Sequence, residues 1–118
     1  MSEAELKQVC EEYLQIGRNR GCLTFLRLNS GNFFISNSDG SFKRRVRGCE
    51  PGTADFEVIT NNGRYDAPNK FHTIVKFLEL KTPEGKQSPE QKSFEEEVKK
   101  QGCEYHIIRS IEDLIEVL

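Results

Sequence analysis

The chain has 118 residues, with 17 basic and 19 acidic side chains and a formal net charge of −2, which does not by itself indicate a nucleic-acid-binding protein. This length fits a single domain, residues 1–118, whose core is large enough to fold without disulfides. No apolar run approaches the length of a membrane span, no signal-peptide pattern opens the sequence, and the four cysteines lack zinc-site spacing, so we expect a cytoplasmic protein with no membrane partner.

Hydrophobic periodicity and turn signals divide the chain into predicted helices and strands. Three amphipathic helices are expected: residues 2–16, a segment from Ser88 to Gly102, and a last short helix after Ser110. Strand-forming runs lie at residues 22–28, 33–36, 41–47, 54–60, 71–81 and 103–109. The resulting order, α-β-β-β-β-β-α-β-α, predicts an α/β domain with a mixed central β-sheet flanked by helices.

Local signals mark several helix boundaries. Ser2 with Glu5, and Ser88 with Gln91, have the spacing of a capping box, and Gly102 lies where a helix should end. The buried face of the last helix is expected to be formed by Ile111, Leu114, Ile115 and Leu118.

Two turn signals predict antiparallel hairpins. The sequence NSDG at residues 37–40 separates the strands 33–36 and 41–47. The sequence NNGR at 61–64 follows the strand 54–60 and opens a predicted connection to the strand 71–81.

The first of these hairpins is strongly basic. Between Arg18 and Arg47 there are seven basic side chains and one acid, against ten basic and eighteen acidic side chains elsewhere in the chain. Lys and Arg gathered on one surface can contact phosphates, and the candidates for contacts with nucleic acid are Lys43, Arg44, Arg45 and Arg47. The alternative is a charged edge strand that guards against aggregation.

Two charged residues interrupt the strand-like run FLELK. Glu79 and Lys81 are two positions apart and therefore share one face of the strand. A buried, isolated charge is costly unless something compensates it. The compensation can be a salt bridge between these two side chains, or a metal ion bound by Glu79 with Lys81 directed at a substrate.

A second acid favours the metal. Asp55 opens the strand 54–60, and antiparallel pairing with the strand 71–81 would place Asp55 beside Glu79 at one end of the sheet. Two close carboxylates repel unless a cation lies between them, and such oxygen ligands suit Mg²⁺ or Mn²⁺. The backbone carbonyl of Leu80 is a further candidate ligand, and Lys81 is placed to orient a water or balance charge on a phosphate.

Three ordered segments resemble the VRR-NUC family of the PD-(D/E)XK, or restriction-endonuclease-like, nuclease superfamily. They are GTADF at 52–56, FLELKTPEGKQSPEQ at 77–91 and GCEYHIIRSIEDL at 102–114. The segments EAELK at 3–7 and NSG at 29–31 also look like N-terminal elements of this family. The resemblance spans nearly the whole chain, and it implies a nuclease with the family's D…E-x-K core.

The resemblance assigns roles to individual residues. Asp55 and Glu79 correspond to metal ligands and Lys81 to the catalytic lysine. Gln91 corresponds to a glutamine that supports the site by hydrogen bonding to the water or metal shell. Asn29 corresponds to a residue near the nucleic acid or the site.

The chain departs from the family pattern at Lys7, near the N-terminal acid, and at Ala54. Glu3 matches an acid that contacts the metal or its water ligands, with stabilisation of the first helical turn as the alternative. Lys7 stands where the family often has a glutamine, which weakens the assignment of Glu3. Ala54 replaces the usual proline before Asp55, at a position that supplies no ligand.

The resemblance implies a Mg²⁺- or Mn²⁺-dependent endonuclease that hydrolyses DNA phosphodiester bonds and needs no organic cofactor. Stand-alone members of this length resemble small phage or bacterial proteins, associated with branched or duplex DNA and four-way junctions in replication, repair or recombination. They tend to act as homodimers, which would place two active sites on two strands. The alternatives are a DNA-binding module that keeps the fold without cutting, and a purely structural pair of Glu79 and Lys81.

Overall fold

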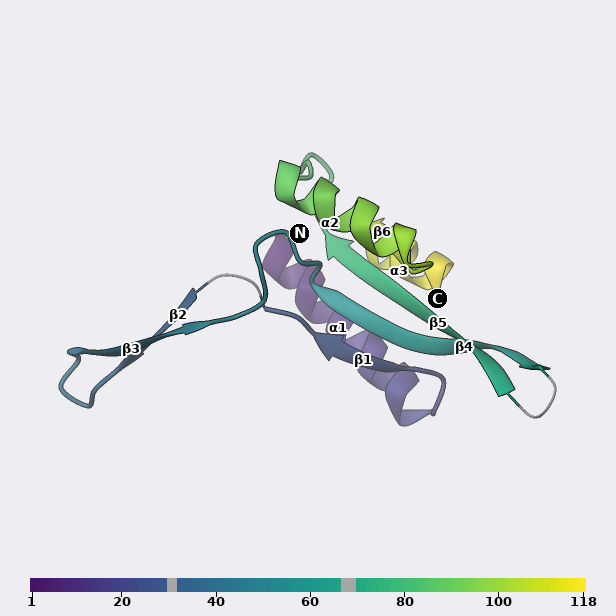
Figure 1. Cartoon of the computed structure of the whole chain (residues 1–118), viewed down its shortest axis with the longest axis horizontal. Helices are drawn as coiled ribbons and strands as arrows, with labels where there is room; N and C mark the ends of the chain where they lie inside the picture. The colour runs from purple at the N-terminus through teal and green to yellow at the C-terminus, as the bar shows by residue number, and fades with distance from the viewer. Residues whose placement is uncertain (30–31, 67–69) are drawn as a thin grey trace.

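The computed structural model of the chain describes residues 1–29, 32–66 and 70–118 (Figure 1). Its elements follow in the order α1 (Glu3–Asn19), β1 (Thr24–Arg27), β2 (Asn32–Ser36), β3 (Phe42–Arg47), β4 (Phe56–Asp66), β5 (Lys70–Leu80), α2 (Pro89–Lys100), β6 (Glu104–Ile108) and α3 (Ile111–Val117). This order confirms the predicted succession of helices and strands. Within the described ranges, no helix is both long and apolar enough to cross a membrane.

The central sheet has the spatial order β1-β4-β5-β6. β4 runs antiparallel to both β1 and β5, whereas β6 runs parallel to β5. A parallel pair cannot be joined by a tight turn, and α2 provides the crossover between β5 and β6. The sheet is therefore mixed, as predicted, and the architecture is that of a restriction-endonuclease-like domain.

The core lies between one face of the sheet and the helices α1 and α3, which Figure 1 shows behind the sheet. The core cluster consists of Leu6, Cys10, Leu14, Phe25, Phe56, Val58, Leu78, Leu80, Ile108 and Leu114. Successive side chains of a strand alternate between faces, so Glu79, between Leu78 and Leu80, points to the opposite face. α2 covers part of that face through Phe94, whose ring centroid lies 5.2 Å from that of Phe77.

The buried face predicted for α3 is only partly right. Leu114 is fully buried and Ile111 packs against the core, but Ile115 and Leu118 are 50% and 40% exposed. α3 is a helix of seven residues that lies at the margin of the core. A short helix in that position buries a narrower stripe than a full amphipathic helix does.

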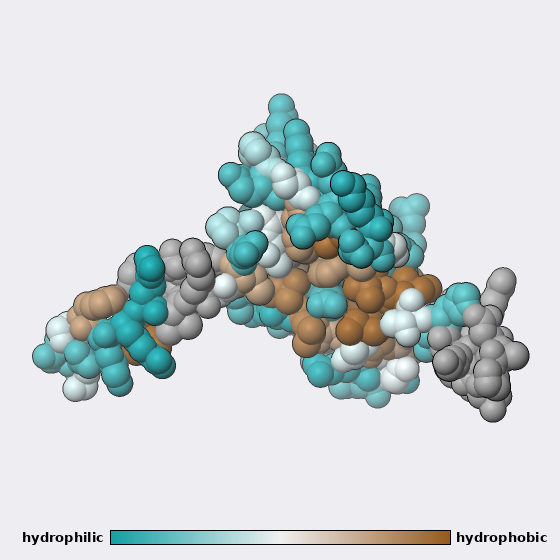
Figure 2. All heavy atoms as spheres, viewed as in Figure 1, coloured by the Kyte–Doolittle hydropathy of each residue, from teal (hydrophilic) through white to brown (hydrophobic). Residues whose placement is uncertain are grey.

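β2 and β3 form a separate two-stranded sheet, which we call the basic arm (Asn32–Arg47). Figure 1 shows the arm projecting from the body, and Figure 2 shows that its described part is largely hydrophilic, whereas hydrophobic residues gather over the central sheet. The predicted NSDG turn is confirmed: Gly40 has a φ of 87° and its N–H donates to the carbonyl of Asn37 at 2.9 Å. At the base of the arm, Leu28 N–H donates to the carbonyl of Asp55 at 2.9 Å.

The turn predicted at NNGR, residues 61–64, is wrong. β4 continues through this sequence as far as Asp66, and β5 begins at Lys70. The pairing register shifts between Asn61 and Tyr65, where the turn-forming sequence is absorbed as an irregularity within the long hairpin. Residues 67–69, which belong to the predicted connection, lie outside the described residues.

Candidate metal centre

Asp55 and Glu79 meet at one end of the sheet, as the predicted antiparallel pairing requires. Phe56 pairs with Leu78, and Asp55 N–H donates to the carbonyl of Leu78 at 3.0 Å. Asp55 precedes β4 instead of opening it, so its side chain reaches past the strand end. Its Oδ2 accepts a hydrogen bond of 2.8 Å from Leu80 N–H, which fixes the carboxylate beside the backbone that carries Glu79.

The carboxyl group of Glu79 is buried and only half compensated. The residue is 3% exposed, and its Oε1 accepts a hydrogen bond of 2.7 Å from Gln91 Nε2. Lys81 Nζ lies 3.8 Å from the same oxygen. Oε2 is buried and has no hydrogen-bond partner among the described residues. The ion pair with Lys81 expected of the structural alternative is present, but it leaves one costly unpartnered oxygen.

The surroundings of Glu79 disfavour its charge. Burial first, and the neighbouring charge of Asp55 second, raise the pKa of the Glu79 carboxyl to about 8, against an opposing effect of Lys81. In the absence of a metal ion, the carboxyl is therefore mostly protonated at neutral pH. A bound divalent ion would favour the ionised form, because it would add positive charge beside the carboxyl.

Gln91 is held in place by the start of α2. Its Oε1 accepts from Ser88 N–H at 2.8 Å, and Ser88 Oγ accepts from Gln91 N–H at 3.1 Å, which confirms the predicted capping box. Because the side-chain oxygen is engaged in the cap, the amide nitrogen faces Glu79. Gln91 was expected to support the site by bonding to the water or metal shell, and the structure gives it a direct bond to Glu79, one of the predicted metal ligands.

Gly52 lets the segment before Asp55 pack against the first turn of α2. Its φ of 94° is one that side chains with a Cβ rarely adopt. A Cβ built there would lie 2.5 Å from the carbonyl oxygen of Glu90. The glycine thus brings together the two segments that deliver Asp55 and Gln91.

Lys7 belongs to the site, although its place in the sequence suggested no role for it. Its Nζ donates to Asp55 Oδ1 at 3.2 Å, across 48 residues of sequence. The side chains of Lys7 and Asp55 are 25% and 21% exposed, so this pair lies at the rim of the site. The only signal in the sequence was that Lys7 stands at a position where the VRR-NUC family often has a glutamine.

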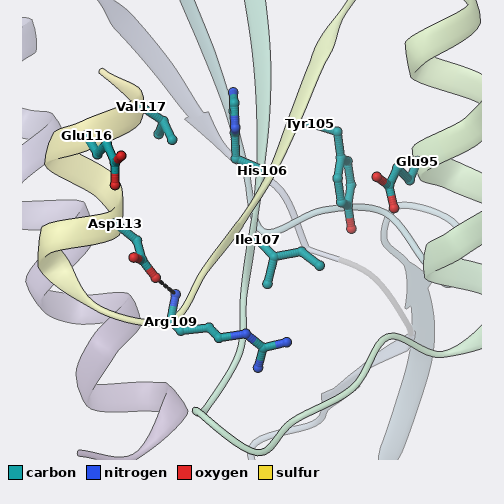
Figure 3. A pocket seen from close by; sticks show the side chains of 8 residues that line it. All are labelled: Glu95, Tyr105, His106, Ile107, Arg109, Asp113, Glu116 and Val117. Atoms are coloured by element: carbon teal, nitrogen blue, oxygen red, sulfur yellow. Dashed lines mark hydrogen bonds between the residues drawn. The ribbon is translucent and has the colours of Figure 1, made fainter.

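Arg109 is a second residue whose role the sequence did not reveal. Figure 3 shows its backbone nitrogen bonded to the Asp113 carboxylate, at 2.9 Å, with the guanidinium pointing away. The guanidinium Nη1 donates to the carbonyls of Thr82 and Gly85 at 2.7 and 2.8 Å. Arg109 thereby fastens the turn between Lys81 and α2. The pocket drawn in Figure 3, of about 450 Å³, is lined by other residues than Asp55, Glu79, Lys81 and Gln91.

The remaining predicted residues lie further out. Glu3 is exposed in the first turn of α1, where its charge contributes to the raised pKa of Glu79. Among the described residues, no group of three or more His, Cys, Asp and Glu side chains converges, so the structure does not bring Glu3 into a ligand cluster. Asn29 is exposed at the base of the arm, where its carbonyl accepts from Cys49 N–H.

The basic residues predicted to contact nucleic acid lie on the arm and not around the carboxylates. Lys43, Arg44 and Arg45 are exposed, and the side chain of Arg47 lies outside the described part of the chain. Leu28, which precedes the arm, bonds to Asp55, whereas Figure 1 shows β3 carried away from the sheet. The hairpin itself therefore projects away from the candidate site instead of flanking it.

The carboxylates suit a hard divalent cation. Two carboxylate oxygens are available to such an ion. One is Oε2 of Glu79, and the other is Oδ1 of Asp55, which the flexible side chain of Lys7 contacts. Leu80 N–H points to Asp55, and in an extended strand the carbonyl of the same residue points to the same edge. Mg²⁺ is commonly held by one or two carboxylates and several waters, and this donor set matches that pattern.

The chain was compared with known protein families, curated proteins and solved structures. The family model of the VRR-NUC domain matches residues 2–112. No curated protein and no solved structure matches the chain. The match covers every residue predicted for the site, including Asp55, Glu79, Lys81 and Gln91, and the mixed α/β fold agrees with it. The chain therefore belongs to the VRR-NUC domain family of nuclease domains.

Proposed function

We propose that the chain is a Mg²⁺- or Mn²⁺-dependent endonuclease that hydrolyses DNA phosphodiester bonds, with specificity for branched DNA or four-way junctions. The observation that carries this proposal is the buried Glu79 carboxyl, whose Oε2 has no partner in the described part of the chain, next to Asp55 and Lys81. If Glu79 and Lys81 formed a purely structural ion pair, the protein would be more stable with both carboxylate oxygens of Glu79 hydrogen-bonded. An acid kept partly unpartnered is better explained by a ligand that binds there.

A divalent ion bound to Asp55 and Glu79 would act as a Lewis acid on the phosphate and lower the pKa of an attacking water. The residues of the chain prepare this site. Gln91 and Leu80 N–H fix the two carboxylates, so that their geometry needs little reorganisation when substrate arrives. Lys81, 15% exposed at its side chain, places an ammonium where it can orient the water or balance charge on the phosphate.

The basic arm is proposed to contact the DNA backbone through Lys43, Arg44, Arg45 and Arg47. The three described side chains are exposed, and the arm is joined to the body next to Asp55. Such contacts position a duplex without reading its sequence, which suits recognition of DNA structure. A homodimer would present two sites to two strands. The proposed setting of this activity is replication, repair or recombination in the cytoplasm.

The test is cleavage of matched linear, flap, nicked and four-way substrates, and of plasmid, with Mg²⁺, Mn²⁺ or EDTA. We expect metal-dependent cleavage with a preference for branched substrates, and a loss on the order of a hundredfold in Lys81→Ala. Glu79→Gln, which has nearly the same shape, should remove metal binding as well as cleavage. Binding of DNA without cleavage under every metal would support the non-cutting module instead. Size measurement in solution tests the homodimer.

A further inference from the structure

The two carboxylates of the site each have a lysine beside them, but the two arrangements differ. Lys81 Nζ is 3.8 Å from Glu79 Oε1, an oxygen that Gln91 already bonds. Lys7 Nζ is 3.2 Å from Asp55 Oδ1, within hydrogen-bond distance. The other oxygen of Asp55 accepts from Leu80 N–H. In the metal-free protein both oxygens of Asp55 are therefore partnered.

Oδ1 is the oxygen of Asp55 that a divalent ion can bind without competing with the backbone, because Oδ2 already accepts a hydrogen bond from Leu80 N–H. The ammonium of Lys7 occupies that position, and two cations cannot share it without strong repulsion. We propose that Lys7 is a resident counter-cation of Asp55, which a divalent metal ion must displace, so that Lys7 sets the metal affinity of the site. This inference rests on the metal site of the proposed function.

The surroundings of Lys7 allow this displacement. α1 is anchored one residue earlier by Leu6, which is 3% exposed, and one turn later by Cys10, which is fully buried. The helix therefore stays in place while the long lysine side chain, itself 25% exposed, can turn towards solvent. The backbone does not have to rearrange when the ammonium leaves.

The same contact has a purpose in the metal-free state. Asp55 lies beside a second carboxyl, and Glu3 adds a further negative charge nearby, as the raised pKa of Glu79 reflects. Lys7 offsets part of this negative charge before a metal arrives. Loss of Lys7 should therefore destabilise the metal-free protein more than the metal-bound one.

The experiment is calorimetric titration of the full chain with Mn²⁺ in the absence of DNA. Three variants are compared with wild type: Lys7→Gln removes the cation, Lys7→Arg keeps it, and Lys100→Gln removes one charge at the exposed end of α2. Lys7→Gln should bind Mn²⁺ roughly three- to fivefold more tightly, the size expected for a partly exposed ion pair. Lys7→Arg should bind Mn²⁺ no more tightly than wild type, because it keeps a cation beside Asp55. Lys100→Gln should bind like wild type.

A second readout is thermal unfolding in EDTA and in Mn²⁺. Lys7→Gln should unfold at a lower temperature than wild type in EDTA, and the difference should shrink in Mn²⁺. Equal or weaker Mn²⁺ binding by Lys7→Gln overturns the proposed role of Lys7. If wild type binds Mn²⁺ and Glu79→Ala does not, the proposed metal site is still supported in that case. If wild type and every variant bind no Mn²⁺, the inference and the proposed metal site both fail.

Discussion

Gln91 Nε2 donates a hydrogen bond of 2.7 Å to Glu79 Oε1, so the first turn of α2 holds the buried carboxyl group of β5. The same side chain closes the capping box through its oxygen. One residue therefore serves both the stability of a helix and the geometry of the site. These two contributions can be separated by mutation.

Gln91→Ala should lower both stability and activity. Loss of the cap costs about 1 kcal/mol of unfolding free energy, and loss of the bond to Glu79 should reduce cleavage roughly 10- to 100-fold. Ser88→Ala is the matched control, because it weakens the cap but leaves the Gln91 bonds to Glu79 and to Ser88 N–H possible. Denaturant unfolding and cleavage rates check the two effects. Equal activity losses in both variants would contradict a separate role for Gln91 at Glu79.

Gly52→Ala should disturb the site from outside it. The new Cβ would meet the Glu90 carbonyl oxygen at 2.5 Å and would also strain a φ of 94°. We expect a loss of roughly 2–4 kcal/mol in unfolding free energy, together with reduced metal affinity.

Gly40→Ala separates the two causes of that loss. Gly40 has a φ of 87°, and a Cβ added there would meet nothing within 4 Å, so only backbone strain applies, at roughly 1 kcal/mol. Unfolding curves and Mn²⁺ titrations of both variants provide the comparison. Equal behaviour of the two variants would show that the packing of Gly52 on Glu90 is unimportant.

The metal-free protein should lose stability as the pH rises. The pKa of Glu79 is raised from 4.5 to about 8 in the folded protein, so in that interval the folded state keeps a proton that the unfolded state has released. This contribution is complete below the unfolded value and is lost as the pH rises through the folded value. Melting temperatures in EDTA between about pH 5 and about pH 9 measure it.

Glu79→Gln is the control for the pH profile, because the amide does not titrate. Its melting temperature should fall less than that of wild type over the same pH range. Mg²⁺ added near the upper end should stabilise wild type, since the ion binds the ionised carboxylate. Identical pH profiles for the two proteins would show that Glu79 does not titrate in this range.

Neutral substitutions on the basic arm should weaken DNA binding without changing the metal site. Replacing Lys43, Arg44 and Arg45 by glutamine should reduce the slope of log affinity against log salt by about one for each phosphate contact removed. Lys100→Gln controls for one lost positive charge elsewhere. Binding is measured over a series of salt concentrations, and Mn²⁺ titration checks the site. An unchanged salt slope in the triple variant would exclude the arm as a phosphate-binding surface.

The parts of the fold that the sequence predicts are those set by local rules. Ser88 and Gln91 define a cap within four residues, and Gly102, with a φ of 87°, ends α2 as expected. The convergence of Asp55 and Glu79 was also predictable, because it needs only antiparallel pairing of two neighbouring strands. Short-range chemistry and simple topology suffice for these features.

The missed features depend on tertiary contacts. Lys7 reaches Asp55 across 48 residues, and Arg109 reaches Thr82 across 27 residues, separations at which sequence spacing gives no guidance. The sequence NNGR has the chemistry of a turn, but the long pairing of β4 with β5 overrides it. In each case, packing in three dimensions decides between choices that the local sequence leaves open.

In the described part of the chain, the two strands of the basic arm pair with each other, outside the hydrogen-bond ladder of the central sheet. Among the described side chains, none from the arm belongs to the buried core. The length of the arm and the number of its charged side chains can therefore change during evolution with little effect on the folding of the domain. The proposed DNA contacts of the arm and the proposed metal site are in this way free to diverge independently within one small protein.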